Sequence, residues 1–305
     1  MGFVSLFSLS CSNNSSKEIN RGVYFWKTNF SLSTEESRWL KETEIQKLYV
    51  RLFDVDWNPN INAAVPVGDA IIETKKIVGV EIIPVIFITN RTLTNLSDSL
   101  ISELSNKIYK KIFAKLSLFE NQTTKEIQLD CDWTETTRAR YFELIDQIKK
   151  LSSKKNIEIT ATIRLHQVKF FSKTGVPPLK RGMLMFYNMS DVSDIRTKNS
   201  IFDKDIAKSY LVNFDKYPLE LDVVLPAFSW SCWFRNGKLK NLINGVGVKD
   251  LEVSSSFVKE DKPLGTIGSL KLVKEFQNDT IILMNSDLLT NIEFQDFYQK
   301  FIDSK

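Results

Sequence analysis

The stretch Glu126–Glu135 reads EIQLDCDWTE and alternates apolar with polar side chains as far as Asp132. Successive side chains of a strand point to opposite faces, so a strand over Glu126–Cys131 separates two sets of residues. The apolar set is Ile127, Leu129 and Cys131, and the polar set is Gln128, Asp130 and Asp132. Apolar residues suit a face covered by helices, so the polar set is predicted to face the interior of a closed barrel.

A second strand divides its residues in the same way. The stretch Ile157–Leu165 reads IEITATIRL. Its polar face carries Thr160, Thr162, Arg164 and then His166. Two neighbouring strands would therefore bring carboxylates, a guanidinium and an imidazole into one interior. A buried charge without a partner is costly, so we expect Asp130 and Arg164 to form an ion pair.

Short β-rich stretches of this kind recur outward from these two and are mostly separated by helical stretches. The expected strands are Gly22–Thr28, Lys47–Phe53, Val80–Thr89, Glu126–Cys131, Ile157–Leu165, Gly182–Tyr187, Leu219–Leu225 and Thr280–Met284. The expected helices cover residues 33–41, 96–118, 134–151, 203–212 and 289–302. Eight strands with helical connections favour parallel pairing, and eight is the number that closes a (β/α)8 TIM-type barrel. We therefore expect an α/β fold with one barrel domain over residues 21–305; a doubly wound open sheet is the alternative.

Composition narrows the classes of function. The chain has 305 residues, 43% of them hydrophobic, and a formal net charge of +4 with both signs interspersed, so no nucleic-acid partner is expected. His166 is the only histidine, the three cysteines lack metal-ligand spacing, and no glycine-rich nucleotide motif occurs. We expect no metal and no cofactor, and we expect a monomer.

The N-terminal residues 1–20 look like the end of a bacterial lipoprotein signal followed by a tether. An apolar run over Phe3–Leu9 precedes Ser10 and Cys11, and a polar stretch follows. The resemblance implies that Cys11 is lipidated and that the protein is anchored in the bacterial cell envelope, contacting the membrane through its lipid only. A charged segment before the apolar run is missing, and a frayed cytosolic N-terminus is the alternative.

Polar and aromatic residues gather where the expected strands end, which is where active sites of this fold lie. They are Asp54, Asp56, Trp57, Asn90, Asp132, Trp133, His166, Gln167, Tyr187, Asn188 and Trp230. Carboxylates and amides hydrogen-bond hydroxyl groups, and an aromatic ring packs on the apolar face of a sugar. The combination predicts a carbohydrate ligand, with Asp130 and Arg164 supporting the site from below. Each tryptophan taken alone is more often a core residue, and Trp26 is left unassigned.

The segment Gln128–Glu135 resembles the fourth-strand signature of the chitinase-like glycoside hydrolases, in which alternating aspartates end in Asp-x-Asp-Trp-Glu and the glutamate is the general acid. Asp130, Asp132 and Trp133 fit the signature, but Thr134 stands in the place of the acid and Glu135 is one residue late. More broadly, the chain resembles uncharacterised bacterial lipoproteins with glycoside-hydrolase-like barrels. That resemblance rests on Leu48–Trp57, Ile127–Thr134, Thr162–Val168 and Gly182–Met189.

These observations predict a cell-envelope glycoside hydrolase. Asp132 would be the acid, its pKa raised by Asp130 and partial burial, and Asp54 or Asp56 would be the base or nucleophile. Glu135 is a second candidate for the acid, although it also suits the first turn of a helix. A non-catalytic carbohydrate-binding lipoprotein is the alternative, favoured by the displaced glutamate. A barrel enzyme acting on phosphorylated metabolites is weaker, because the last loop lacks a glycine-rich phosphate cradle.

Overall fold

The computed structural model describes residues 20–120, 123–244, 257–258 and 280–285. Eight strands in it pair side by side in parallel. They are β1 (Asn20–Phe25), β3 (Lys47–Asn58), β6 (Glu81–Ile88), β7 (Glu126–Asp130), β8 (Glu158–Arg164), β9 (Arg181–Met185), β10 (Glu220–Pro226) and β14 (Thr280–Asn285). Their order is β1-β14-β10-β9-β8-β7-β6-β3, and β1 also pairs with β3, which closes the ring. All eight expected strands are confirmed, and the expected TIM-type barrel is the observed fold.

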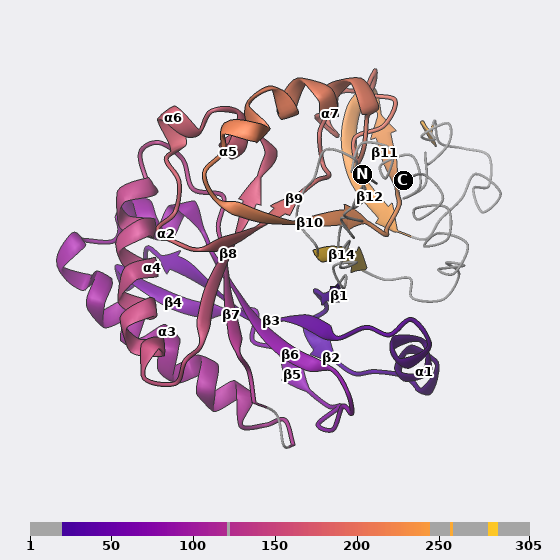
Figure 1. Ribbon diagram of the computed structural model, residues 1–305. Coiled ribbons are helices and arrows are strands. Elements are labelled where there is room, and N and C mark those ends of the chain that lie inside the picture. The colour runs from indigo at the N-terminus through magenta and orange to yellow at the C-terminus, as the bar shows by residue number, and fades with distance from the viewer. Residues whose placement is uncertain (1–19, 121–122, 245–256, 259–279, 286–305) are drawn as a thin grey trace, which may run out of the picture.

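Helices cover the outside of the barrel (Figure 1). They are α1 (Thr34–Glu42), α2 (Asn90–Asn95), α3 (Ile101–Leu116), α4 (Arg138–Ser153), α5 (Leu165–Lys169), α6 (Phe171–Thr174) and α7 (Lys204–Tyr210), with 3₁₀ turns at Asp98–Leu100 and Leu211–Lys216. The first helix begins at a capping box: the Ser33 side chain accepts from the backbone of Glu36, and the Glu36 side chain accepts from the backbone of Ser33. The helix expected over 96–118 is divided into a 3₁₀ turn and α3, and the one expected over 289–302 lies outside the described residues.

The buried apolar residues form two layers, as the alternation of the strands requires. The larger layer lies between the strands and the helices, and it includes Ile127, Leu129 and Cys131 of the β7 segment. The smaller one fills the barrel interior with Tyr24, Tyr49, Ile83, Val85, Met183, Met185 and Val224. Polar residues share this interior, and they are Glu126, Gln128, Asp130, Thr160, Thr162 and Asp222. The polar faces predicted for β7 and β8 therefore do point inward.

Ion pairs close the amino-terminal end of the interior. Glu126 accepts from Lys47 Nζ at 2.7 Å and from an Arg181 guanidinium nitrogen at 3.0 Å. Arg181 also pairs with Glu158 and Asp222. These contacts compensate the buried charges at this end and leave the carboxyl ends of the strands as the place for a ligand site.

Several short strands lie outside the ring of eight parallel strands. β4 (Ala63–Val67) forms an antiparallel hairpin with the end of β3, and β2 (Asn29–Phe30) pairs with β5 (Ile71–Ile72). After β10, the strands β11 (Trp230–Arg235), β12 (Lys238–Asn244) and β13 (Phe257–Val258) form a separate antiparallel sheet. All of these short strands lie in stretches for which the sequence predicted neither a strand nor a helix. Among the described residues, no helix has the length and apolar character needed to span a membrane.

Candidate functional site

A β-bulge in β3 shapes one wall of the barrel mouth, which is the opening at the carboxyl ends of the eight parallel strands. Arg51 is opposite Val85 of β6, and Phe53 is opposite the next residue, Ile86, so Leu52 is an extra residue in β3. Leu52 and Phe53 both pack in the outer layer, and the alternation restarts with Asp54 on the same side as Arg51. Arg51 Nε donates to Asp54 Oδ1 at 2.6 Å, and a second guanidinium nitrogen donates to Oδ2.

The opposite wall is built by β7 and β8 around Arg164. One Arg164 guanidinium nitrogen donates to Asp130 Oδ1 at 2.9 Å, which confirms the expected ion pair. Thr162 Oγ1 donates to the same oxygen at 2.5 Å. Arg164 Nε also donates to Asp132 Oδ1, so one guanidinium holds two carboxylates. The side chain of Asp130 is 4% exposed and that of Asp132 is 51% exposed, so Arg164 joins a buried group to the protein surface.

Burial and the neighbouring Arg164 charge shift the pKa of Asp130 in opposite directions. Burial raises the pKa of this carboxyl above its usual range, while the neighbouring Arg164 lowers it; the net direction is upward. Asp132 and Asp54 raise the Asp130 pKa further, because each adds negative charge nearby. A raised pKa is thus found at Asp130, the buried neighbour of the expected acid.

Asp56 is held by several donors at once. Its Oδ1 accepts from Thr89 Oγ1 at 2.7 Å, from the Trp57 backbone at 2.8 Å and from Arg91 Nε at 3.1 Å, and Oδ2 accepts from Arg91. The hydrogen bonds from Arg91 are the main cause that lowers the pKa of Asp56 to about 2. A carboxylate with such a low pKa is a poor proton acceptor, which disfavours the base role expected for Asp56; the nucleophile role stays a prediction.

Aromatic rings line the same mouth. Trp26, which follows β1, lies parallel to Tyr24 with the ring centroids 5.3 Å apart. Phe228 contacts Tyr187 edge-on at 5.8 Å and Trp230 at 5.1 Å. Trp26, Tyr187 and Phe228 all pack against the interior cluster while staying partly exposed. Together with Trp230, these rings give the mouth the apolar faces that a sugar site requires.

Two donors of the barrel interior have no hydrogen-bond partner among the residues that the structure describes. They are the buried indole nitrogen of Trp26 and the buried amide nitrogen of Gln128. Tyr24 connects the two residues, because its ring stacks on Trp26 and its hydroxyl donates to Gln128 Oε1 at 2.5 Å. Buried donors are normally satisfied, so this part of the interior suits a water molecule or an acceptor group of a ligand.

Three residues expected to bind substrate belong to the core instead. Trp57 packs in the outer layer, and Trp133 is fully buried, stacks on Tyr141 and donates its indole N–H to the Thr174 carbonyl at 2.9 Å. Gln167 is also fully buried and bridges the Trp133 carbonyl and the Arg164 backbone N–H. These predictions were wrong because all three side chains are buried, Trp57 and Trp133 in the outer layer and Gln167 against the backbone of Trp133 and Arg164.

The other expected residues lie at or near the mouth. Asn90 donates to the Asp132 carbonyl and accepts from Thr137 Oγ1 at 2.8 Å, so both ends of its amide position the loop after β7. His166 and Asn188 are exposed, and partial burial lowers the pKa of His166. Glu135 is exposed in the turn before α4 and forms no hydrogen bond or ion pair with the described residues. Cys11 lies outside the described residues.

Sequence reasoning missed four contributors to the mouth. Arg51 shares a face with Tyr49 in the expected strand Lys47–Phe53, and this spacing could have revealed it. Trp26 was recognised but left unassigned. Arg91 and Phe228 lie in connections whose geometry no alternation pattern encodes.

Comparison with solved structures identifies the architecture. A chitinase from Chromobacterium violaceum superposes with a TM-score of 0.59 at 9% identity, covering 93% of this chain and 99% of that one. A GH18 chitinase from Flavobacterium johnsoniae gives 0.59 at 15% identity, covering 94% and 95%. The chain has a chitinase-like barrel fold.

A third chitinase-like barrel is the spore cortex-lytic enzyme of Bacillus cereus, with a TM-score of 0.56 at 13% identity over 94% of this chain and 74% of that one. No protein-family model and no curated protein sequence matches the chain. Identities this low support the fold only. Within this chitinase-like barrel, Thr134 follows Trp133 at the position of the signature glutamate, and its Oγ1 lies 3.0 Å from Thr136 Oγ1.

Proposed function

We propose that this protein is a carbohydrate-binding barrel that holds a glycan at the carboxyl ends of its strands without a chitinase-type acid. The observation that carries the proposal is that each strand-end aspartate is engaged by an arginine. Arg51 holds Asp54, Arg91 holds Asp56, and Arg164 holds Asp132 together with Asp130.

Such pairing suits recognition better than proton transfer. A general acid must carry a proton to the leaving group, whereas the oxygens of these carboxylates are already engaged as hydrogen-bond acceptors of arginine side chains. The free lone pairs of Asp132, which is half exposed, remain able to accept from sugar hydroxyls. Thr134 offers a hydroxyl where the signature has a carboxyl.

The aromatic rings supply the second element of a sugar site. Trp230 donates its indole N–H to Ser200 Oγ at 3.1 Å, which fixes the ring while leaving it partly exposed. Phe228 packs against it on one side and against Tyr187 on the other. Because chitinases and spore cortex-lytic enzymes share the fold, chitin oligosaccharides and peptidoglycan fragments are the first ligands to test.

The test is titration calorimetry of the purified protein with chitin oligosaccharides and muropeptides. We expect saturable binding with no product formed, and a loss of at least tenfold in affinity on Trp230→Ala. The matched control is Trp39→Ala, because Trp39 is also partly exposed but belongs to α1 on the outside of the barrel. Absence of binding to either class, or an equal loss in both variants, would contradict the proposal.

Glycoside hydrolysis is the second candidate, and Glu135 favours it. This carboxyl is exposed, has no partner among the described residues and follows the strand-end segment directly. If a glycan is turned over, Glu135→Gln should lower the rate by about 10²–10⁴-fold, the usual worth of a general acid. Asp132→Asn tests the original assignment in the same assay. If Asp132→Asn causes the larger loss, Asp132 is the acid; turnover by the parent protein would in either case refute the binding-only proposal.

We also propose that the protein is a lipid-anchored component of the bacterial cell envelope, with Cys11 as the lipidated residue. The support is the apolar run ending at Ser10-Cys11 and the polar stretch that follows. Mass spectrometry of protein purified from native membranes should find a diacylglyceryl-modified Cys11 at the new N-terminus. An unmodified peptide spanning Ser10 and Cys11 would refute this assignment.

A further inference from the structure

The amino-terminal end of the barrel carries a cluster of exposed lysines, here called the basal lysine cluster. Its members are Lys125, Lys150, Lys154, Lys155 and Lys180. They come from the segments that precede β7, β8 and β9, three neighbouring strands of the barrel. All five therefore lie at the end of the barrel opposite the candidate glycan site.

Backbone and side-chain contacts bring these segments together. The Glu158 N–H donates to the Lys125 carbonyl at 2.8 Å, which joins the starts of β7 and β8. Lys149 donates to the Pro178 carbonyl, which joins the end of α4 to the segment before β9. Lys155 Nζ lies 3.8 Å from the centroid of the Phe113 ring and so stays at the surface of α3.

The charges of the cluster are uncompensated among the described residues. None of the five lysines forms an ion pair there. Glu126 and Glu158, at the starts of β7 and β8, are engaged by Arg181, and Glu126 also by Lys47. Glu81 and Glu120 line the hollow beside Lys125 but form no ion pair with the five lysines. Lysines at helix ends commonly complement the helix dipole, but Lys125 and Lys180 directly precede strands and have no such role.

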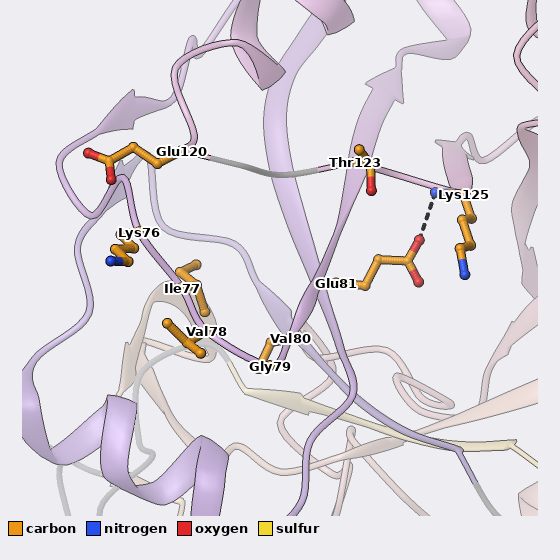
Figure 2. A pocket seen from close by; sticks show the side chains of 9 residues that line it. All are labelled: Lys76, Ile77, Val78, Gly79, Val80, Glu81, Glu120, Thr123 and Lys125. Atoms are coloured by element: carbon orange, nitrogen blue, oxygen red, sulfur yellow. Dashed lines mark hydrogen bonds between the residues drawn. The ribbon is translucent and has the colours of Figure 1, made fainter.

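A hollow of about 500 Å³ lies beside the cluster but has a different character (Figure 2). It is lined by Lys76 and Lys125 and equally by Glu81 and Glu120, and Glu81 accepts from the Lys125 backbone at 2.7 Å. Charges of both signs make the hollow a poor anion site. The basal lysine cluster, rather than the hollow, is therefore the feature suited to an anionic partner.

We propose that the basal lysine cluster docks the barrel on an anionic phospholipid surface, with the glycan site facing away from the membrane. Charge complementarity supports this partner, since a lysine close to an anionic bilayer is worth about fivefold in partitioning. Geometry supports it as well, because β1 begins at Asn20 at this same end. If Cys11 is lipidated, as proposed above, the nine residues to Asn20 reach at most about 30 Å, which keeps this end near the bilayer.

The test uses the full chain with Cys11→Ser, so that no lipid anchor contributes, and sedimentation with vesicles in 50 mM salt. We expect binding to equimolar phosphatidylglycerol and phosphatidylcholine, no binding to phosphatidylcholine alone, and release at 0.5 M salt because of screening. The triple variant Lys150→Glu/Lys154→Glu/Lys155→Glu should weaken the partitioning by more than about a hundredfold, because each change removes a positive charge and adds a negative one.

The matched control is Lys198→Glu/Lys204→Glu/Lys208→Glu, which makes the same change of charge with exposed lysines between β9 and the end of α7. It should lower partitioning less than threefold, and both variants should keep the melting temperature. An equal loss in both triples would refute the proposal, as would failure of the parent protein to bind the anionic vesicles. Loss of heparin binding with vesicle binding unchanged would assign the cluster to a polyanion instead. Glycan binding should be unaffected by the basal substitutions, which separates this test from that of the proposed function.

Discussion

Replacing Arg164 by alanine should destabilise the protein in a way that depends on pH. The side chain holds Asp130, which is almost fully buried, and its removal leaves Thr162 as the remaining side-chain donor to that carboxylate. Leaving one member of a buried pair without its partner costs about 3–5 kcal/mol. Asp132 adds less than about 1 kcal/mol, because that carboxylate is half exposed and water replaces the lost partner.

The sign of the pH dependence follows from the raised pKa of Asp130. Burial already raises this pKa in the native protein, and loss of the Arg164 charge raises it further. Between the unfolded and the folded pKa of Asp130, the native state binds a proton that the unfolded state does not. Stability contributed in this way is present at low pH and falls as the pH rises, by about 1.4 kcal/mol for each pH unit over which Asp130 stays protonated.

Urea unfolding at pH 5 and pH 8, followed by far-ultraviolet circular dichroism, measures both effects. We expect Arg164→Ala to lose more stability at pH 8 than at pH 5, and the double variant with Asp130→Asn to recover part of the loss at pH 8. Arg91→Ala is the control, because Arg91 holds its aspartate at the surface, and it should shift the midpoint far less. An Arg164→Ala variant with an unchanged midpoint at pH 8 would refute the buried-pair reasoning.

Three further outcomes are expected. Gly182→Ala should lower the free energy of unfolding by about 1–3 kcal/mol in urea, because the added Cβ would lie 2.7 Å from Ile163 Cγ1 in a filled core. An unchanged midpoint would show that the neighbouring side chains can move to accommodate the methyl group. Trp133→Ala should lower the free energy of unfolding by about 3–5 kcal/mol and leave the glycan affinity of the folded protein unchanged. A loss of affinity without a loss of stability would show that Trp133 contacts the glycan. Asp56 stabilises the fold above its unfolded pKa, and this contribution should be lost as the pH falls from 4 to 2; Asp56→Asn should flatten the acid limb of a stability titration over that interval.

The fold was predictable because its strands carry strong signals. The polar–apolar alternation of Glu126–Cys131 and Ile157–Leu165 is reproduced in the division between the barrel interior and the outer layer. The added strands β4, β11 and β12 were not predicted, because an antiparallel ribbon at the rim lacks the long buried run that marks a barrel strand. The lipoprotein signal stays a prediction.

The site was predictable only where the strand pattern continued to the residue in question. The pairing of Asp130 with Arg164 followed from two alternations and one physical rule. Trp133 was misplaced because the chain leaves the strand after Asp130, and the reasoning did not fix the face of the next side chains. The donors to Asp56 could not be foreseen, since Arg91 reaches it from a helix 35 positions further along the chain.

The extra residue Leu52 decides which side chains of β3 reach the mouth. If β3 paired regularly through Leu52, strict alternation would turn Phe53 and Val55 toward the interior and Asp54 and Asp56 toward the helices. The bulge absorbs one residue and so keeps the two carboxylates at the mouth. Deleting Leu52 would remove the bulge and leave Phe53 outside and Asp54 inside, as they are now. A one-residue gap at this position in an alignment would therefore mark the loss of a bulge and would not change which side chains face a ligand.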